Sequence, residues 1–232
     1  MKEILIIPDV HGRTFWRDAI ERHPDHPRIF LGDYVDPYTW GEGIDMPTAI
    51  GELESIIELK KKEPDKTILL YGNHCTHYLW DEAEKSTRYD EAYKEELQEL
   101  YGSVEFKVAH QEGNYLFTHA GCTKKWFEQN QFEVPEGNIA DFLNNLSLLS
   151  EGRRALTDIG RSRGGYAPSG GPMWADWNDD FGWWYEELYP GLIQIFGHTQ
   201  VYDPQNYKQK LWCLDCREAF ILNTDEGTIT KA

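Results

Sequence analysis

The stretch Ile4-Leu5-Ile6-Ile7-Pro8-Asp9-Val10-His11-Gly12 carries the pattern that organises the whole chain. Its first half is a short apolar, β-branched run, which is typical of a buried β-strand. A proline ends the run, and an acid and a histidine follow at once. Four more apolar runs end in a Gly or Thr followed by Asp, Asn or His, at residues 29–33, 68–74, 115–119 and 192–198.

Helical patterns lie between several of these runs. Residues 47–62 carry apolar side chains at helical spacing behind Asp45, a suitable N-cap, and residues 89–101 carry an apolar face opposite a charged one. Strands that alternate with helices predict an α/β sheet covered by helices. Residues 207–231 are predicted to form alternating strands with a turn at Asp225-Glu226-Gly227.

The polar residues that follow the predicted strands are expected to meet. In open α/β sheets, ligands bind at the carboxyl ends of the strands, so the five strand ends should lie in one neighbourhood. The residues concerned are Asp9, His11, Asp33, Asp36, Asn73, His74, His119 and His198.

This mixture of imidazole and carboxylate groups suits first-row transition metals such as Mn, Fe and Zn. A set of oxygen ligands alone would have indicated Mg or Ca. The set is larger than one tetrahedral site needs. Two metals that share a bridging carboxylate, roughly 3.5–4 Å apart, would use the whole set and would hold both the attacking and the leaving oxygen of a displacement.

The composition indicates a folded domain of ordinary size. The chain has 232 residues, 40% hydrophobic and 27% charged, which excludes disorder for most of its length. We expect a single domain over residues 1–232. Residues 121–190, rich in Trp and Gly, are predicted to form an insert of helices and loops over one side of the site. Its tryptophans are expected to pack in the core and a lid, or to line a pocket that stacks a base or sugar.

Charge and cysteine content narrow the possible partners and compartments. The formal net charge of −17 repels phosphate backbones, so generic nucleic-acid binding is not expected. The chain lacks an apolar run of the roughly 18 residues that a membrane span requires, and residues 4–7 are interpreted as a strand rather than as part of a signal peptide. The four cysteines are too few for a disulfide scaffold, so we expect a cytoplasmic protein.

The five polar blocks resemble, in order, the motif blocks of the calcineurin-like metallophosphoesterases. Each block alone is a weak signal, but five in order are a strong one. The resemblance implies an α/β fold of four layers, an αββα sandwich with two central sheets flanked by helices. The blocks are Asp9-Val10-His11-Gly12, Gly32-Asp33-Tyr34-Val35-Asp36, Gly72-Asn73-His74, Thr118-His119-Ala120-Gly121 and Gly197-His198-Thr199-Gln200.

Within that family, the phosphoprotein-phosphatase-like branch, which is related to serine/threonine phosphatases, is the most similar. The second block has the form found in that branch, and Met173-Trp174-Ala175-Asp176 is similar to its Leu-Trp-Ser-Asp segment. Gln200 also stands where many other branches have a second metal-binding His. Two positions depart from the pattern: Pro37 replaces a phosphate-binding Arg, and Cys75 replaces the Glu or Asp that follows the third-block His.

The resemblance implies a dinuclear centre in which Asp33 bridges two divalent transition-metal ions, of which manganese is expected first and iron or zinc are the alternatives. Asp9 and His11 would hold the first ion. The second ion would be held by Asn73, His119 and His198.

The resemblance also implies two catalytic residues and one substrate contact. His74 would donate a proton to the leaving alkoxide, and Asp36 would orient it. This role agrees with the chemistry of the groups, since His titrates near neutrality and a carboxylate partner keeps it protonated and aimed. Asn73 would also touch the substrate phosphate.

A cationic side chain is expected to replace the Arg that is missing at Pro37. An Arg is preferred because its fork matches phosphate oxygens bidentately. Arg163, in a glycine-flanked loop, is the first candidate, and Arg13, directly after the first block, is the second.

Other chemically suggestive residues are interpreted as structural. Asp176 is left outside the site, and Cys213-Leu214-Asp215-Cys216 is read as a strand segment rather than as a redox or zinc motif, because residues three apart on a strand point to opposite faces. Cys75 is assigned no nucleophilic role. The histidines that match no block are His23, His26, His77 and His110.

The sequence therefore predicts a dinuclear metallophosphoesterase that hydrolyses phosphomonoesters, including phosphoserine and phosphothreonine, by attack of a hydroxide that bridges the metals. Its partners would be a phosphorylated small molecule or a phosphoprotein, with no membrane. One alternative is a hydrolase of nucleotides or dinucleoside polyphosphates, similar to bacterial diadenosine tetraphosphate hydrolases. The other is a non-catalytic scaffold with the phosphatase fold.

Overall fold

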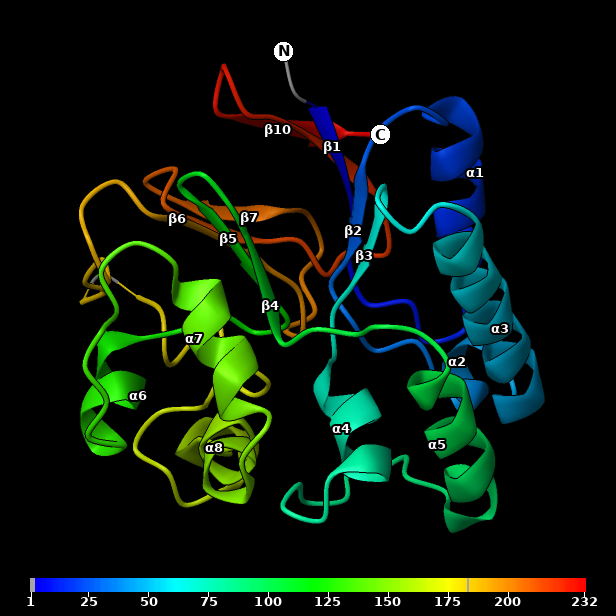
Figure 1. Ribbon diagram of the computed structural model, residues 1–232, viewed down its shortest axis with the longest axis horizontal. Helices are drawn as coiled ribbons and strands as arrows, with labels where there is room; N and C mark the ends of the chain where they lie inside the picture. Colours follow the sequence, from blue (N-terminus) through cyan, green and yellow to red (C-terminus); the bar gives the residue numbers. More distant parts are fainter. Residues whose placement is uncertain (1–2, 183) are drawn as a thin grey trace.

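The computed structural model describes residues 3–182 and 184–232 and contains two five-stranded sheets (Figure 1). The first sheet has the strand order β10-β9-β1-β2-β3. Its strands are β1 (Glu3–Ile7), β2 (Arg28–Phe30), β3 (Thr67–Leu69), β9 (Phe220–Asn223) and β10 (Thr228–Lys231). Strands β1, β2 and β3 are parallel, with Ile6 opposite Ile29 and Ile29 opposite Ile68, and β9 runs antiparallel to β1.

The second sheet has the order β4-β5-β6-β8-β7. Strands β5, β6 and β8 are parallel, and β4 and β7 run antiparallel to them at the two edges. The bounds are β4 (Ala109–Glu112), β5 (Tyr115–Thr118), β6 (Ile193–Phe196), β7 (Gln205–Tyr207) and β8 (Leu211–Cys213).

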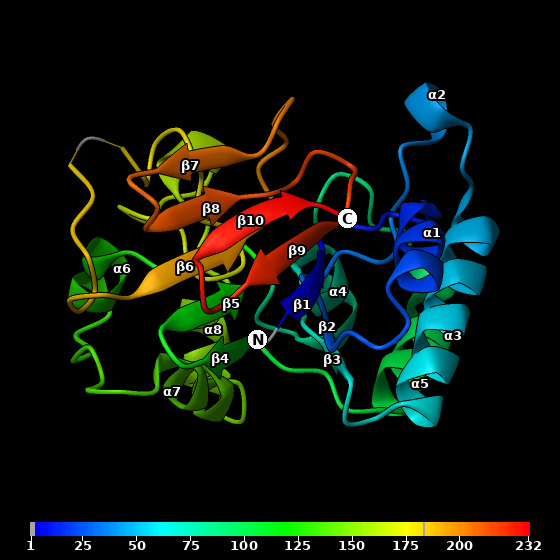
Figure 2. The same ribbon diagram turned by 90° about the horizontal axis from the view of Figure 1, so that it is seen from above.

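Helices cover the outer face of each sheet. On the first sheet lie α1 (Phe15–Arg22), α3 (Met46–Lys62) and α5 (Lys94–Gly102), and on the second lie α6 (Lys124–Gln129), α7 (Ile139–Leu146) and α8 (Ser150–Leu156) (Figures 1 and 2). The shorter helices belong to connecting segments: α2 (Thr39–Glu42), α4 (Asn73–Leu79), η1 (Glu91–Tyr93) and η2 (Arg161–Arg163). The expected αββα sandwich is confirmed.

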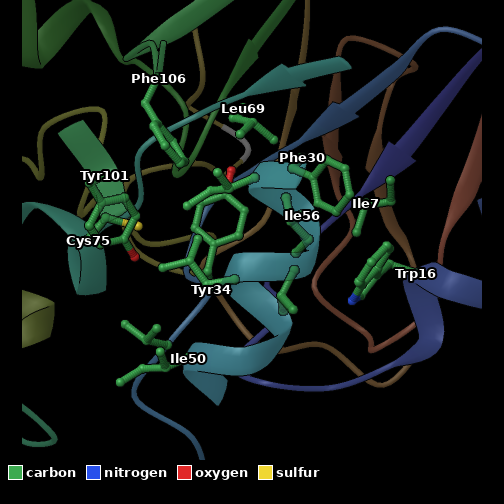
Figure 3. Packing of buried hydrophobic residues seen from close by; sticks show 14 of the residues in the cluster. Ile7, Trp16, Phe30, Tyr34, Ile50, Ile56, Leu69, Cys75, Tyr101 and Phe106 are labelled. Atoms are coloured by element: carbon green, nitrogen blue, oxygen red, sulfur yellow. The ribbon is translucent and has the colours of Figure 1, made fainter. Parts of the chain in front are cut away.

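Strand β1 shows how the sequence builds these layers. Because side chains alternate along a strand, Leu5 and Ile7 enter the core beneath the helices, whereas Ile4 and Ile6 enter the core between the two sheets. Figure 3 shows the first core, in which Ile56 of α3 packs beside Ile7 and Phe30. Each fully buried side chain of this size contributes about 1.5–3 kcal/mol by leaving water. Both faces of β1 are therefore apolar because one face packs against the helices and the other against the second sheet.

The predicted helix over residues 47–62 is α3, and the predicted cap is present. The Asp45 carboxylate accepts a hydrogen bond from the Thr48 amide at 2.9 Å. Pro47 follows within the first turn of the helix. Three lysines lie in its last turn, where their positive charges interact favourably with the negative end of the helix dipole. The predicted helix over 89–101 is η1 followed by α5.

Among the described residues, no helix combines the length and the apolar character needed to cross a bilayer.

Candidate metal centre

The polar residues that follow five strands meet at one edge of the sandwich. Residues 9 and 11 follow β1, residues 33 and 36 follow β2, residues 73 and 74 follow β3 at the start of α4, residue 119 follows β5, and residue 198 follows β6. The structure brings together all eight residues that the sequence places at strand ends, and all are buried.

Four of these residues have a left-handed backbone. The φ angle is +47° at His11, +52° at Asp33, +58° at Asp36 and +65° at His198. Non-glycine residues rarely adopt this conformation, which costs about 1–3 kcal/mol each and persists where the surroundings enforce it. The backbone therefore turns sharply after each strand so that the side chain points into the shared site.

Two glycines allow the backbones to approach the carboxylates closely. A Cβ at Gly72 would overlap the Asp33 carboxylate, and a Cβ at Gly197 would overlap that of Asp9. In the same loops, the His74 amide donates to Asp33 Oδ1 at 2.9 Å and the His198 amide donates to Asp9 Oδ1 at 3.0 Å. Each carboxylate is thus held through one oxygen by a neighbouring loop, and its other oxygen is left for a ligand.

The first group of potential metal ligands is Asp33, His119 and His198, with Asn73 beside them. His119 Nε2 lies 3.4 Å from Asp33 Oδ2, 2.9 Å from Asn73 Oδ1 and 3.2 Å from His198 Nδ1. On its far side, His119 Nδ1 donates to the Leu31 carbonyl at 2.9 Å. This bond directs Nε2 toward the group, as is usual for a histidine that binds a metal.

The second group is His11, Asp33 and His74. His11 Nδ1 donates to the Val35 carbonyl at 2.7 Å, which turns His11 Nε2 to a position 3.6 Å from Asp33 Oδ2. Within each of the two groups, one ligand atom from every residue lies within 4.8 Å of the others. Asp33 belongs to both groups.

The histidines of the site differ in the direction in which their pKa is shifted. Burial opposes a charge on His119, but the carboxylates of Asp33 and Asp9 outweigh it and raise the pKa of this imidazole to about 9. Burial lowers the pKa of His11 to about 3 and holds the pKa of His198 well below its ordinary value. Burial acts to raise the pKa of Asp33, but the neighbouring His119 and His74 keep it well below the ordinary range.

These residues fit a divalent transition metal. His11 and His198 are neutral and offer lone pairs, and Asp33 is ionised. His198 Nδ1 faces the group, 3.2 Å from His119 Nε2 and 3.0 Å from Asn73 Oδ1. Imidazole with carboxylate is a donor set for Mn, Fe or Zn.

A third group, of Asp36, His74 and His77, shares His74 with the second group. His74 Nδ1 is 2.7 Å from Asp36 Oδ2, His77 Nε2 is 2.8 Å from the same oxygen, and the Tyr78 hydroxyl donates to Asp36 Oδ1 at 2.6 Å. Burial acts to raise the pKa of Asp36, but the hydrogen bonds from His74 and His77 lower it overall. Asp36 is therefore a fixed anion that orients the His74 ring.

A pocket of about 360 Å³ opens over the centre, and two arginines line it. The Arg88 guanidinium lies 3.1 Å from His74 Nε2 and 3.4 Å from His11 Nε2, its Nε donates to the Asp36 carbonyl at 2.8 Å, and it stacks 3.8 Å above the Tyr38 ring. Arg163 also lines the pocket.

The two arginines named from the sequence make different contacts. Arg163 is held by an ion pair of 2.6 Å with Asp176 and donates to Thr199 Oγ1 at 2.8 Å. Arg13 gives its Nε and one terminal nitrogen to Glu42, at 2.7 and 2.9 Å, and reaches the Asp9 carbonyl at 3.4 Å. Both guanidinium groups thus pair with a carboxylate, and of the two arginines it is Arg163 that lines the pocket over the centre.

Sequence reasoning missed three site residues. Arg88 lies in a loop that resembles no motif block, and His77 follows the third block by one helical turn on the same helix as His74, which is the signal that could have identified it. Asp215 is buried close to Asp9, and burial, followed by the charge of Asp9, raises the pKa of its carboxyl to about 8.

The cysteines behave as structural residues. Cys75, Cys122, Cys213 and Cys216 are all free thiols. Burial raises the pKa of the Cys75 thiol to about 12, which disfavours the reactive thiolate. Cys213 is the last residue of β8 and is buried, whereas Cys216 lies beyond the strand and is partly exposed.

Comparison with known proteins agrees with this geometry. The family model of the calcineurin-like phosphoesterases matches residues 2–202, so the chain belongs to this family. Its fold and its His/Asp clusters are those of a metal-dependent phosphoesterase, a hydrolase whose substrates are phosphorylated. Comparison with curated proteins finds no match.

One solved structure shares the fold at low sequence identity, and two others align with lower TM-scores. A protein serine/threonine phosphatase from Saccharomyces cerevisiae with similarity to human phosphatase PP5 aligns with a TM-score of 0.57 and 16% identity, over 100% of this chain and 79% of that one. Yfce, a phosphoesterase from E. coli, aligns with a TM-score of 0.41 and 10% identity, over 99% of this chain and 98% of that one. A metallophosphoesterase from Sphaerobacter thermophilus gives 0.43 and 13%, over 99% and 88%.

Proposed function

We propose that this protein is a dinuclear metallophosphoesterase that hydrolyses phosphomonoesters. The observation that carries the proposal is the position of Asp33, whose Oδ2 lies 3.6 Å from His11 Nε2 on one side and 3.4 Å from His119 Nε2 on the other. A carboxylate shared in this way is suited to bridge two cations. Manganese is the expected metal, with iron and zinc as alternatives, because each accepts both imidazole and carboxylate ligands.

The ligands divide between the two ions. Asp9 and His11 would hold the first ion, and Asp33 would be shared. The second ion would be held by Asn73, His119 and His198, whose side-chain donors lie within 3.2 Å of one another. When bound, such a pair of cations lowers the pKa of a coordinated water and neutralises charge on the phosphate oxygens.

The protein side chains supply the remaining chemistry. His74 gives a proton from Nε2 to the leaving oxygen, while Asp36 holds its Nδ1 proton and stabilises the charged ring. Arg88 is placed to hold the phosphate, because its guanidinium lies between His11 and His74 on the wall of the pocket. Arg163 and the Asn73 amide provide further contacts to the phosphate oxygens.

The substrate proposed first is a phosphomonoester with an alkyl leaving group, including phosphoserine and phosphothreonine. Such a leaving group departs as a basic alkoxide, and the His74–Asp36 pair is suited to protonate it. The shared fold with a serine/threonine phosphatase is consistent with this class. A non-catalytic scaffold is disfavoured, because such a protein would be expected to have lost ligands or the acid, whereas all are present.

A panel of phosphate esters tests the proposal, assayed with added Mn²⁺ on the wild type and on His74→Asn. The wild type should hydrolyse phosphoserine peptides and bind close to two equivalents of metal. His74→Asn should retain its metal and lose turnover on alkyl esters far more than on p-nitrophenyl phosphate, whose leaving group needs no proton. One equivalent of metal would reject the dinuclear centre, and equal turnover by the two proteins would reject His74 as the acid.

A further inference from the structure

His77 lies beside the general acid but has no part in the chemistry proposed so far. It is on α4, one helical turn after His74, and the centroids of the two rings are 5.3 Å apart. Its side chain is buried, and the pocket over the metal centre is lined by other residues. Any effect of His77 on the reaction must therefore be exerted through the groups that it contacts.

The contacts of His77 determine which of its nitrogens carries the proton. The Ser86 amide donates to Nδ1 at 3.2 Å, so this nitrogen presents a lone pair and the ring is neutral. Burial agrees with this assignment, because it lowers the pKa of His77. A neutral imidazole keeps one proton, which is therefore on Nε2, 2.8 Å from Asp36 Oδ2. The two nitrogens of one ring thus contact two different parts of the site.

This arrangement explains why the third group, of Asp36, His74 and His77, is not assigned to a metal. A metal ligand must present a lone pair, whereas His77 presents the Nε2 proton to the Asp36 carboxylate. His74 Nδ1 is 2.7 Å from the same carboxylate oxygen. Asp36 Oδ2 is therefore held between two imidazoles, one of which is the proton donor to the leaving group.

The other contact of His77 belongs to the loop that carries Arg88. Residues 80–90 connect α4 to η1, and both Ser86 and Arg88 line the pocket over the centre. Arg88 Nε donates to the Asp36 carbonyl at 2.8 Å, so the loop returns to the residue that His77 also contacts. A connection of this length has many conformations, and each contact that fixes it limits where the guanidinium can lie.

We propose that His77 is a positioning residue that sets the spacing between the proton donor His74 and the phosphate contact Arg88. One nitrogen of its ring holds the Asp36 carboxylate that orients His74, and the other holds the loop that places Arg88. This inference rests on the proposed phosphoesterase function and adds the residue through which its two parts are joined. A ring that only filled space would need no polar partner at either nitrogen.

Two amide substitutions separate the two contacts. The side chain of Asn places its oxygen near the position of Nδ1, so His77→Asn can keep the Ser86 contact but cannot reach Asp36. The longer side chain of Gln reaches the position of Nε2, so His77→Gln can keep the Asp36 contact but leaves the Ser86 amide without its acceptor. His77→Phe keeps the packing against Tyr78 and Tyr89 and removes both polar contacts.

Catalysis and phosphate binding should respond differently to these variants. His77→Asn should lower kcat on phosphoserine peptides by about tenfold, the size expected for a lost hydrogen bond to a charged group, and should change kcat on p-nitrophenyl phosphate much less. His77→Gln should keep the wild-type ratio between these esters and raise the Kd for inorganic phosphate by about fivefold. Calorimetry on the Mn²⁺-loaded protein measures this Kd. His77→Phe should show both losses.

His26 supplies the matched control, because its Nε2 pairs with Glu3 at 2.9 Å away from the pocket. His26→Asn and His26→Gln should change neither property. The same losses in His77→Asn and His77→Gln, or wild-type values in His77→Phe, would overturn the proposal. Nitrogen-15 NMR of the wild-type imidazoles tests the arrangement without any variant, and a proton on Nδ1 of His77 would overturn it as well.

Phosphate binding and NMR separate this inference from the proposed function, because neither requires turnover. A wild type that hydrolyses no ester would refute the proposed function, and a weaker phosphate affinity in His77→Gln but not in His77→Asn would then still support the loop contact. An active wild type whose His77 variants all bind phosphate as tightly as it does would refute the positioning role alone.

Discussion

Asp36 Oδ2 lies 2.7 Å from His74 Nδ1, and the same carboxylate accepts a hydrogen bond from the Tyr78 hydroxyl at 2.6 Å. The carboxylate is fully buried, and its neighbours lower its pKa overall although burial acts to raise it. A buried anion fixed in this way determines which nitrogen of His74 carries the proton in the neutral ring and stabilises the ring when it is charged.

The first prediction follows from this pair. Asp36→Asn should lower kcat on alkyl phosphomonoesters by about 10²–10⁴-fold, the usual contribution of a positioned general acid, because the charged ring loses its partner. The loss on p-nitrophenyl phosphate should be much smaller. Tyr78→Phe is the control, since it removes one hydrogen bond and retains the carboxylate. Equal losses on both esters with unchanged metal content would contradict the assignment.

The second prediction concerns the phosphate clamp, by which we mean Arg88 and Arg163, the two arginines that we propose to hold the substrate phosphate. Arg88→Ala should raise both KM and the inhibition constant for inorganic phosphate by roughly tenfold or more, since a hydrogen bond to a charged group contributes about 1.5–3 kcal/mol. Arg88→Lys should recover only part of the loss, because a single ammonium cannot form the planar fork. Steady-state kinetics with phosphate as the inhibitor measures both constants.

Arg163→Ala and Arg13→Ala complete this comparison. Arg163→Ala should also lower turnover, because the side chain lines the pocket, although Asp176 and Thr199 already engage it. Arg13→Ala should act mainly by releasing Glu42. An unchanged turnover in Arg163→Ala would remove that residue from the clamp, and a larger loss in Arg13→Ala than in Arg88→Ala would reverse the assignment.

The third prediction tests the close approach of the Gly72 backbone to the carboxylate of Asp33, the residue that we propose to bridge the metals. Gly72→Ala should displace Asp33, because the added methyl group would overlap its carboxylate. We expect a folded protein with reduced metal content and at least tenfold lower activity. Metal analysis and circular dichroism measure the two properties separately.

Gly51→Ala is the matched control for this substitution. Gly51 lies inside α3, and nothing lies within 4 Å of a Cβ there. Alanine should stabilise the helix by about 0.5–1 kcal/mol without changing metal content. Full metal occupancy in Gly72→Ala would show that Asp33 tolerates the displacement or plays no part in binding.

The strand ends and the polar residues that follow them could be predicted because the signals are local. An apolar run that is buried on both faces, as at Ile4 to Ile7, is visible in the sequence, and the polar residue that follows must lie at the edge of the sheet. The Asp45 cap and α3 follow from the same local rules. Glycines such as Gly72 stand directly before the polar residues of one strand end and permit the close approach of a carboxylate from another strand end.

Arg88 could not be predicted, because its position depends on tertiary structure. It lies 14 residues beyond His74 in sequence and returns to the site through contacts with the Asp36 carbonyl and the Tyr38 ring. No short-range sequence pattern indicates that the loop carrying Arg88 packs back against the site. Arg13 shows the converse, since its position beside a motif block predicts a role in phosphate binding and its guanidinium pairs with Glu42. That carboxylate is 29 residues away in sequence.

The last prediction joins metal binding to pH. The pKa of His119 is about 9 in the folded protein, against an ordinary value of 6.5, because Asp33 and Asp9 outweigh the effect of burial. A raised pKa of this kind contributes stability that is complete below pH 6.5 and is lost as the pH rises through 9. Asp215 also makes the folded protein less stable as the pH rises, up to about pH 8. Its carboxyl keeps a proton in the folded protein that the unfolded chain has already released. The chelator-treated protein should therefore show a Tm that falls between pH 6.5 and pH 9.

Manganese should reverse this dependence, because a ligand must lose its proton before it binds a metal. Over the same interval, the affinity for Mn²⁺ should increase, and the difference in Tm between loaded and chelator-treated protein should grow. At a free concentration one hundred times the dissociation constant, the metal should add about 2.7 kcal/mol. Thermal unfolding of the wild type and of His119→Gln at several pH values provides the test, and the variant should show the weaker dependence. A Tm that stays constant or rises with pH in the chelator-treated wild type would show that His119 is not protonated in the folded protein. The charges of Asp33 and Asp9 would then be compensated by another group.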